Sequence, residues 1–229
     1  VASPTPTQQN FILYQGATAT LRSEDFDKAY IETADVFVHG SVTLANPSGA
    51  ALAQAARWAR QAGKEVIFDV NLRPGVWPDL DTALQRILVA LTSASVVKVN
   101  EVETEFLTGT RDPARGARRL IEQGLQLCCV SLGDDGAYFA TSAASGHVPA
   151  FKVEAVDTTG CGDAFVAGLA FELSSRGKPP KQLSETELRN MIRFANACGA
   201  LTATQLGAMS ALPDRAAVEA LLQSTNAAK

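Results

Sequence analysis

The sequence predicts an α/β fold built on a mostly parallel β-sheet. Short apolar runs bounded by glycine or polar residues, typical of buried strands, alternate with segments of helical length and helical apolar spacing. Strands separated by helices of roughly 10–16 residues form βαβ units, in which neighbouring strands are parallel. Polar residues follow several strands, which is where open α/β sheets bind ligands. We therefore expect one layered structure over residues 36–132, with helices on both faces of the sheet.

The composition is that of a globular chain and argues against several kinds of partner. Of 229 residues, 46% are hydrophobic and 19% charged, enough for one large core or two modest ones. A net charge of −4 without a block of lysine or arginine disfavours nucleic acid and anionic membranes. No apolar run approaches the roughly 18–20 residues that cross a membrane. Residues 1–7 lack the basic start and apolar core of a signal peptide, so we expect a cytoplasmic protein.

Cysteines and histidines predict neither a disulfide framework nor a metal or hydrolase site. The cysteines at 128, 129, 161 and 198 show no CxxC spacing and are expected to be reduced thiols. His39 ends a predicted strand, where we expect a packed, hydrogen-bonded side chain, and His147 is expected to be exposed in a turn. Two distant histidines disfavour a Ser-His-Asp hydrolase, and neither a Walker motif nor a dinucleotide-binding glycine motif is present.

The first 33 residues are predicted to contain one strand and one helix. Residues 1–9, rich in proline, threonine and glutamine, are expected to form an extended loop. The run 10–14 has the composition of a short strand, and 15–17 that of a turn. Ser23, which two acidic residues follow, is a suitable N-cap for a helix that runs to about residue 33.

Strands and helices alternate between residues 36 and 140. Short apolar runs predict the strands, and Gly63 is in the usual position for the end of a helix. The predicted strands are 36–41, 66–70, 96–99, 127–132 and 136–140, with a turn at 133–135. The predicted helices are 47–62, 80–91, 101–107 and 114–123. Beyond them we expect a β-rich run over 150–156 and helices near 164–175, 185–204 and 213–223, with no repeat or linker that divides the chain.

Polar side chains follow three neighbouring strands of the predicted sheet. They are Asp69, Asn71 and Arg73 after one strand, Asn100 and Glu103 after the next, and residues 131–136 after the third. Because the carboxyl ends of parallel strands lie at one edge of a sheet, we expect these residues to meet there. The loop 160–163, which precedes the next helix, is expected to face the same edge.

The turn at 160–163 is the strongest candidate for chemistry. Gly160 and Gly162 allow a tight turn and a close approach of the backbone to a ligand. The N–H groups at the start of the following helix, together with its dipole, favour an anion. Asp163 sits within this anion-binding turn, where a carboxylate is suited to remove a proton from a hydroxyl beside a phosphoryl group. The alternative is that Asp157 or Asp163 caps the helix and the glycines only form the turn.

The segment from Asp157 to Asp163, D-T-T-G-C-G-D, resembles the C-terminal signature D-T-x-G-A-G-D of the ribokinase-like (PfkB) family of sugar and nucleoside kinases. Cys161 replaces the usual alanine, but its backbone N–H can still donate a hydrogen bond. The resemblance extends from about residue 10 to residue 213 and is strongest to the fructokinase branch. It implies a three-layer α/β/α sandwich with a mostly parallel central sheet. Residues 1–22 would be the remnant of a small β lid with its connection, and 23–229 the kinase core.

Two further motifs resemble parts of the family's phosphate site. D-x-N-x-R at 69–73 recurs in the fructokinase and 2-keto-3-deoxygluconate kinase branches, which implies that Asp69, Asn71 and Arg73 bind the substrate or the transferred phosphate. Asn100 and Glu103 match N-x-x-E, which implies that Glu103 helps to hold Mg²⁺, partly through water. Without the resemblance, these are also an ordinary strand end and an ordinary helix cap. Lys98 is either a phosphate partner or a strand residue whose charge reaches solvent.

The resemblance also implies a nucleotide site and a cation loop. The implied ATP-binding residues are Asn100, Ser131, Gly133, Gly136, Asn196 and Gly207. On pattern alone, 131–136 is equally a hairpin turn, and the small residues at 197–200 suit either a flat base or close helix packing. Asp157 and Thr159 resemble the monovalent-cation loop of several relatives, and K⁺ binding is left open.

The implied reaction is transfer of the γ-phosphoryl group of ATP to a primary sugar hydroxyl, with fructose giving fructose 6-phosphate as the leading case. Asp163 would act as the base, and the N–H groups of Gly160, Cys161 and Gly162 would stabilise charge on the phosphoryl oxygens. Mg²⁺, held through Glu103 and the nucleotide, would neutralise the phosphates. The alternatives are a 2-keto-3-deoxygluconate kinase or another sugar kinase of the family, and a catalytically silent regulatory relative that binds sugar or nucleotide.

Family members begin with a longer N-terminal segment, which carries a G-G-x-x-x-N sugar-binding motif, several sheet strands and part of the lid. Without that segment, we expect an apolar sheet edge to be exposed. We also expect the chain to need those residues, from the same gene or a second polypeptide, for solubility and activity. A homodimer is expected when the full lid is present. A soluble, monodisperse monomer would contradict the expected requirement.

Overall fold

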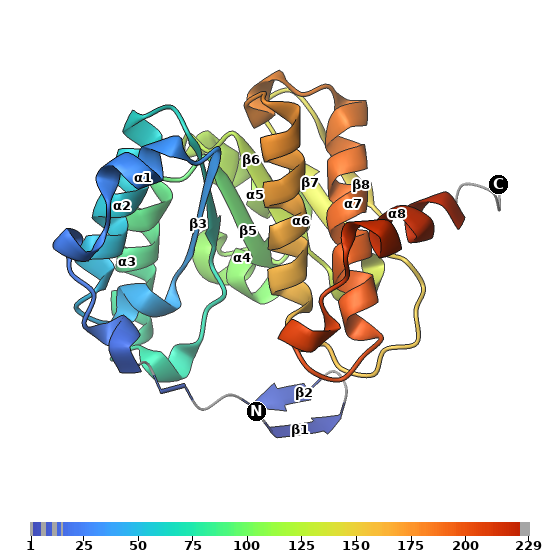
Figure 1. Ribbon diagram of the computed structural model, residues 1–229, viewed down its shortest axis with the longest axis horizontal. Helices are drawn as coiled ribbons and strands as arrows, with labels where there is room; N and C mark the ends of the chain where they lie inside the picture. The colour runs from blue at the N-terminus through green and yellow to red at the C-terminus, as the bar shows by residue number, and fades with distance from the viewer. Residues whose placement is uncertain (1, 6–7, 11–12, 15, 225–229) are drawn as a thin grey trace.

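The computed structural model describes residues 2–5, 8–10, 13–14 and 16–224, and a six-stranded sheet forms its centre (Figure 1). The strands lie across the sheet in chain order: β3 (Val36–Gly40), β4 (Glu65–Asp69), β5 (Val96–Asn100), β6 (Leu127–Ser131), β7 (Ala137–Ala140) and β8 (Ser145–Val148). β3 to β6 are parallel, and β7 and β8 extend the sheet as antiparallel strands. The expected mostly parallel sheet is confirmed.

Four helices cover one face of this sheet, and a short fifth helix packs beside them (Figure 1). They are α2 (Gly49–Gln61), α3 (Leu80–Leu91), α4 (Glu101–Thr108) and α5 (Pro113–Glu122), with α1 (Lys28–Thr33) against α2. Successive strand residues point to opposite faces, so only alternate residues face these helices. Val66, Phe68 and Val70 accordingly belong to the core under α2 to α5, whereas Ile67 belongs to the core on the other face.

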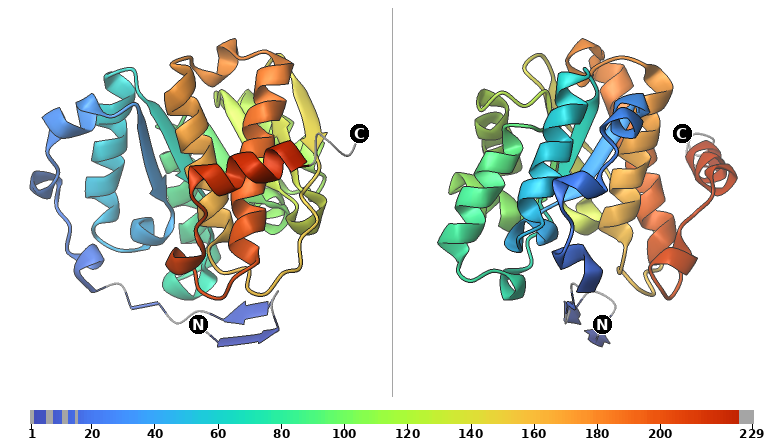
Figure 2. Two further views of the ribbon diagram at one scale, coloured as in Figure 1. Left: turned by 45° about the vertical axis from the view of Figure 1, so that its right-hand side comes forward. Right: turned by 60° about the vertical axis from the view of Figure 1, so that its left-hand side comes forward.

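The third layer consists of α6 (Cys161–Arg176) and α7 (Glu185–Ala203), with α8 (Arg215–Ser224) crossing outside them (Figure 2). The three-layer α/β/α sandwich is confirmed, but the expectation that the helices within 36–132 occupy both faces is wrong. Because β3 to β6 are added in one direction and crossovers share one hand, their connecting helices all lie on one face. Within the described residues, no helix combines the length and apolar character that a membrane crossing requires.

The chain begins with an antiparallel pair, β1 (Ala2–Thr5) and β2 (Gln8–Asn10), where a loop was expected over 1–9. Pairing gives the backbone N–H and C=O groups of the two segments partners that an extended loop lacks. The strand expected over 10–14 is not found in the described residues. Asn10 ends β2, Leu13 and Tyr14 belong to no strand, and residues 11 and 12 lie outside the described part of the chain.

Local hydrogen bonds explain three other differences from the predicted elements. Helix α1 begins at Lys28, not after Ser23, because the carboxylate of Asp27 accepts the N–H of Tyr30 at 3.1 Å and caps the helix there. β8 was not predicted; the Thr141 hydroxyl bonds both the N–H and the C=O of Ala144, which turns the chain back along β7. Residues 150–156 form no strand, and their last N–H donates to the carbonyl of Ala203 at the end of α7.

Candidate active site

The parallel strands end at the sheet edge where α6 begins, and the β1–β2 pair lies beyond this edge (Figure 2). The closest link between strand and helix is at Lys98, near the end of β5. A Cβ atom placed on Gly162, in the first turn of α6, would lie 3.2 Å from the Nζ atom of Lys98. The strand ends and the loop 160–163 therefore lie together in the structure, as predicted, and Lys98 is the strand residue that contacts the loop.

The start of α6 is held by backbone geometry and has no side-chain cap. Its N-cap residue, Gly160, has a φ of 85°, a left-handed conformation that favours glycine. A Cβ atom on Gly160 would also lie 3.1 Å from that of Ala208. The N–H of Cys161 donates to the carbonyl of Thr158 at 3.2 Å, whereas those of Gly160 and Gly162 make no backbone hydrogen bond within the described chain. Of the three amides expected to receive a phosphoryl group, two are thus available.

Asp163 projects from the first turn of α6 into solvent. Its carboxylate makes no hydrogen bond or ion pair with other described residues, so the helix-capping alternative does not apply to it. Asp157 does not cap α6 either, because Gly160 occupies that position without a side-chain bond. The carboxylate of Asp163 is close enough to Asp69 to add to the rise in the pKa of that group. An exposed, unpaired carboxylate can accept a proton from a hydroxyl that binds within hydrogen-bond distance of it.

Asp69, the last residue of β4, forms an ion pair with Lys98 inside the protein. Asp69 Oδ1 lies 3.2 Å from Lys98 Nζ, and the two side chains are 10% and 8% exposed. Burial raises the pKa of Asp69, which the ammonium of Lys98 lowers and the carboxylates of Glu103 and Asp163 raise further. Lys98 therefore does not extend to solvent, and its partner lies 29 residues earlier in the chain, paired with it across parallel strands.

Glu103 is buried, with 3% of its surface exposed, and both of its carboxylate oxygens accept backbone hydrogen bonds. Oε1 accepts the N–H of Leu72 at 2.8 Å, and Oε2 accepts the N–H of Asn100 at 2.9 Å. The Asn100 side chain in turn accepts the N–H of Glu103 at 2.9 Å, which completes a capping box. The N-x-x-E motif thus joins the loop after β4 to the start of α4.

The loop after β4 turns sharply at Asn71, whose φ is 36°. Asn71 is the single non-glycine residue with positive φ among the described residues, and such backbone strain is concentrated at functional sites. The next residue, Leu72, is fixed by Glu103, and Arg73 then leads into a 3-10 turn at Pro74–Val76. Arg73 is half-buried, and it follows the sharp turn at the sheet edge.

A groove of about 350 Å³ opens beside the start of α6. Six of the predicted site residues line it: Ser131, Gly133, Gly136, Cys161, Gly162 and, from α7, Asn196. Thr158 of the 157–163 motif also lines it, as does Lys152, which no motif included. The groove therefore collects residues from β6, the turn after it, α6 and α7, and it unites several of the predicted motifs.

Three of the predicted nucleotide residues have structural partners in this groove. The Asn196 amide donates to the carbonyls of Val148 at 3.0 Å and Pro149 at 3.2 Å. The Ser131 hydroxyl donates to the carbonyl of Val99 at 3.2 Å. Gly136 has a φ of 103°, and a Cβ atom there would lie 2.2 Å from the carbonyl oxygen of Val148. These residues shape the groove wall, and their contact with a nucleotide stays a prediction.

The small residues at 197–200 serve both close helix packing and the groove. A Cβ atom on Gly199 would lie 3.2 Å from the Cys161 carbonyl oxygen, so α6 and α7 meet tightly here. Gly199 and Ala200 also line the groove. The two interpretations left open by the sequence are therefore not exclusive.

Asp157 ties the loop before α6 to a second loop after α7. Its Oδ1 accepts the N–H of Thr159 at 2.9 Å and the hydroxyl of Thr159 at 2.7 Å, and its Oδ2 accepts the N–H of Gly207 at 3.1 Å. Gly207 is thus placed by a hydrogen bond to Asp157. Across the described residues, no three His, Cys, Asp or Glu side chains converge as a metal site.

Of the cysteines and histidines, Cys161 alone lines the groove among the described residues. All four cysteines are free thiols, as predicted, and burial raises the pKa of Cys161 to about 11. His147 is exposed, as expected, but it lies on β8 and not in a turn. His39 packs against the ring of Phe68 at 4.8 Å, and burial lowers its pKa to about 4. Neither ring nitrogen of His39 has a hydrogen-bond partner in the described structure, so the expected hydrogen bond is absent.

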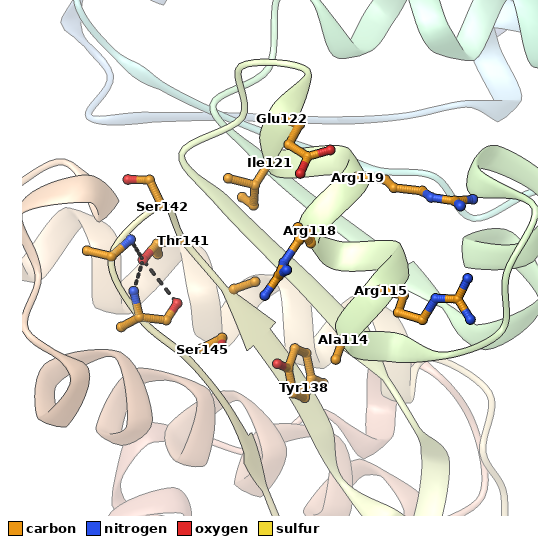
Figure 3. A pocket seen from close by; sticks show the side chains of 13 residues that line it. Ala114, Arg115, Arg118, Arg119, Ile121, Glu122, Tyr138, Thr141, Ser142 and Ser145 are labelled. Atoms are coloured by element: carbon orange, nitrogen blue, oxygen red, sulfur yellow. Dashed lines mark hydrogen bonds between the residues drawn. The ribbon is translucent and has the colours of Figure 1, made fainter.

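A larger groove, of about 1000 Å³, lies between α5 and the β7–β8 turn (Figure 3). It is lined in part by Arg115, Arg118 and Arg119. Figure 3 shows the guanidinium group of Arg118 directed toward the side of Tyr138, whereas those of Arg115 and Arg119 point the other way. The three cations therefore do not converge on one anion, and none of the predicted site residues lies here.

Comparison with known proteins identifies the family of this chain. A family model described as "pfkB family carbohydrate kinase" matches residues 1–215. The probable chloroplastic fructokinase-6 of Arabidopsis thaliana is 39% identical over 223 residues, which are 95% of this chain and 58% of that protein. The chain thus spans less than two thirds of the length of that relative.

Two solved structures are similar in fold. The fructokinase of Xylella fastidiosa with bound ATP matches with a TM-score of 0.83 and 28% identity, over 91% of this chain and 67% of that one. The fructokinase of Vibrio cholerae O395 with fructose, ADP and calcium matches with a TM-score of 0.79 and 36% identity, over 88% and 64%. From the matched sequence, the sheet order and the glycine-lined start of α6, we conclude that the chain belongs to the pfkB family of carbohydrate kinases.

Proposed function

We propose that this protein is an ATP-dependent sugar kinase that transfers the γ-phosphoryl group of ATP to a primary hydroxyl, converting fructose to fructose 6-phosphate. The observation that carries the proposal is the exposed, unpaired carboxylate of Asp163 beside the open amides of Gly160 and Gly162. The Vibrio relative, whose structure contains fructose and ADP, supports the choice of sugar. The Xylella relative, whose structure contains ATP, supports the choice of nucleotide.

In this proposal, Asp163 takes the proton from the sugar hydroxyl as the hydroxyl oxygen attacks the γ-phosphorus. A positioned general base contributes about 10²–10⁴-fold in rate. The Gly160 and Gly162 amides, reinforced by the positive end of the α6 dipole, stabilise charge on the phosphoryl oxygens. The N–H of Cys161 donates to the carbonyl of Thr158, so in this proposal it does not contact the phosphoryl group.

The nucleotide is proposed to occupy the groove beside α6. Its wall at Gly133, where a Cβ atom would meet nothing within 4 Å, lets a ligand approach the backbone closely. Gly136 instead allows close packing against the Val148 carbonyl, and both glycines have positive φ. Gly199 and Ala200 leave room for a flat base on the α7 side. Asn196 and Ser131 hold the wall through hydrogen bonds to carbonyls, and Asn100 and Gly207 are proposed to shape the ends of the site.

Magnesium is proposed to bind at Glu103 through water. The oxygen donors at this edge suit a hard cation, but both oxygens of Glu103 already accept N–H bonds. A carboxylate oxygen has a second acceptor position, so a bridging water fits the donors present. When bound, the ion supplies positive charge to the nucleotide phosphates. Substrate contact by Asp69, Asn71 and Arg73, and K⁺ binding at Asp157 and Thr159, are parts of the same proposal.

An ADP-release assay on the purified product of the complete gene tests this function. Fructose, ribose, 2-keto-3-deoxygluconate and nucleosides are each supplied with ATP and Mg²⁺, with K⁺ replaced by choline in parallel. We expect fructose to give the largest kcat/KM. A larger value for 2-keto-3-deoxygluconate would assign the protein to that kinase class instead. Nucleotide binding without turnover on any acceptor would favour the silent regulatory relative. Sedimentation of the same sample tests the proposed homodimer, and cell fractionation tests the proposed cytoplasmic location.

A further inference from the structure

A buried lysine at the candidate site has no role in the mechanism above. Lys98 is 6% exposed and lies on β5, in the interior of the sheet. Alternation along the strands places it on the α6 face, since its neighbour two residues earlier, Val96, belongs to the core under α6 and α7. Asp69 is on the same face by the same rule, because Ile67 also belongs to that core. Lys98 does not line the nucleotide groove.

The ammonium group of Lys98 lies directly behind the first turn of α6. Its Nζ atom is 3.2 Å from Asp69 Oδ1 and 3.2 Å from the position that a Cβ atom of Gly162 would take. Gly162 lines the groove on its other side. One glycine backbone therefore separates the buried cation from the groove.

The ion pair with Asp69 is weak evidence that stability is the reason for a cation at this place. The first turn of a helix carries partial positive charge, so a neighbouring ammonium is repelled by it. Burying an ion pair is costly, and apolar residues of similar volume are often as stable or more so. The cation behind Gly162 and the positive end of the α6 dipole would both be stabilised by an anion bound in the groove on the other side of Gly162.

We propose that Lys98, held in place by Asp69, stabilises the transferred phosphoryl group through the Gly162 backbone. This inference rests on the proposed kinase function, whose phosphoryl group would occupy the turn at 160–163. Lys98 is a positioning residue, since it acts by its charge from behind the turn. Glycine at 162 leaves room for the ammonium, because a Cβ atom there would lie 3.2 Å from Lys98 Nζ.

A double-mutant cycle separates this role from simple neutralisation of Asp69. The variants are Lys98→Met, Asp69→Asn and both together, with Lys98→Arg as the charge-conserving variant and exposed Lys181→Met as the matched control. The first readout is kcat against KM for ATP. The second is the affinity for ADP with beryllium trifluoride, which imitates the phosphoryl group, compared with that for ADP alone.

We expect Lys98→Met to lower kcat and the affinity for ADP–beryllium trifluoride by about 10- to 100-fold, with the affinity for ADP changed less than about threefold. The same loss is expected when Lys98→Met is added to Asp69→Asn, where no carboxylate is left unpaired. Lys98→Arg is expected to recover part of the loss. The double variant replaces a buried ion pair by neutral groups of similar size, so it provides a folded sample even if Lys98→Met alone does not.

Two results would overturn the inference. One is unchanged affinity for ADP–beryllium trifluoride in Lys98→Met. The other is an equal affinity in Asp69→Asn and in the double variant, which would mean that Lys98 only neutralises Asp69. Failure of the proposed function is a separate outcome, because it shows as absent sugar phosphorylation by the unmodified protein. The affinity measurements still decide the role of Lys98 in that case.

Discussion

Two helices begin at the same edge of the sheet, and they begin in opposite ways. Helix α4 starts with a complete capping box, in which Asn100 and Glu103 each accept the other's backbone N–H at 2.9 Å. Helix α6 starts at Gly160, without any side-chain cap, and its first-turn carboxylate, Asp163, faces solvent. Each helix carries an acidic residue in its first turn, so acidity alone does not distinguish the two.

The difference shows that one edge of a sheet can hold both a helix start that stabilises the fold and a helix start whose N–H groups are free to bind a ligand. A helix leaves its first N–H groups without partners, and a cap satisfies some of them. At α4 the cap is completed, and Glu103 also fixes the loop after β4 through Leu72. At α6 the N–H groups of Gly160 and Gly162 stay open within the described chain. Substitutions at the start of α4 should therefore mainly lower the free energy of unfolding, and substitutions at the start of α6 should mainly lower kcat.

The largest effect is expected at Asp163. Asp163→Asn should lower kcat by about 10²–10⁴-fold, because an amide cannot accept the hydroxyl proton. The affinity for ATP and the free energy of unfolding should change little, since the carboxylate has no partner within the described structure. Steady-state kinetics and nucleotide titration check this result. Asp112→Asn, which keeps a cap on α5, is the matched control. Equal turnover in Asp163→Asn and the unmodified protein would show that the carboxylate at the start of α6 does not act in catalysis.

The largest effect on stability is expected at Glu103. Glu103→Ala leaves the N–H groups of Leu72 and Asn100 without their partner in a buried place, which should lower the free energy of unfolding by about 2–4 kcal/mol. Urea unfolding measures the loss. Glu105→Ala serves as the control, since its ion pair with Arg111 is largely exposed and should contribute less than about 1 kcal/mol. Similar losses at the two positions would show that the capping box is not what stabilises α4.

A smaller effect on stability, coupled to activity, is expected at Gly160. Gly160→Ala forces a side chain into left-handed backbone, which costs about 1–2 kcal/mol, and places its Cβ atom 3.1 Å from that of Ala208. The turn must then shift, so kcat should fall as well. Gly109→Ala, at the end of α4, meets the same backbone strain at a φ of 72°, and its Cβ atom would make only an ordinary contact, 3.9 Å from Arg119 Nη1. Gly109→Ala should lower stability by a similar amount without lowering kcat. If kcat falls equally in both variants, the loss of activity in Gly160→Ala does not come from a shift of the turn at 160–163.

Helix boundaries near this edge could be predicted from the sequence, because their signals lie in neighbouring residues. Pairings between residues far apart in the sequence could not. The boundaries of α3 match the prediction, and those of α4 differ by one residue, because apolar period and caps are local signals. The face on which each helix lies depends on strand order and crossover hand, and this was predicted wrongly. β8 was missed because its turn depends on a single hydroxyl, that of Thr141.

The site shows the same division between local and distant information. The turn at 160–163 and the groove lining were found through motifs of adjacent residues. The ion pair of Lys98 with Asp69 was not found, because it joins two strands whose register the sequence does not state. A signal was present, however. Each charged residue sits in an otherwise apolar strand on the same face, and a buried cation in that position needs a nearby anion.

The smallest effect is expected at a third helix start, which repeats the α4 arrangement on the surface. Helix α7 begins with Ser184 and Glu187, and the hydrogen bonds from the Ser184 backbone and hydroxyl lower the pKa of Glu187 to about 2. A carboxylate whose pKa is lower in the folded state than in the unfolded state stabilises the protein at any pH above the unfolded-state pKa. This stabilisation is lost as the pH falls through the folded-state pKa. The loss should therefore occur between about pH 4.5 and pH 2. Glu187→Gln should flatten the fall of the thermal midpoint in the part of this window where the protein stays folded, without changing kcat. If the variant loses stability with acid as steeply as the unmodified protein, the cap of α7 is not held by charge. The resemblance between α7 and α4 would then be one of geometry alone.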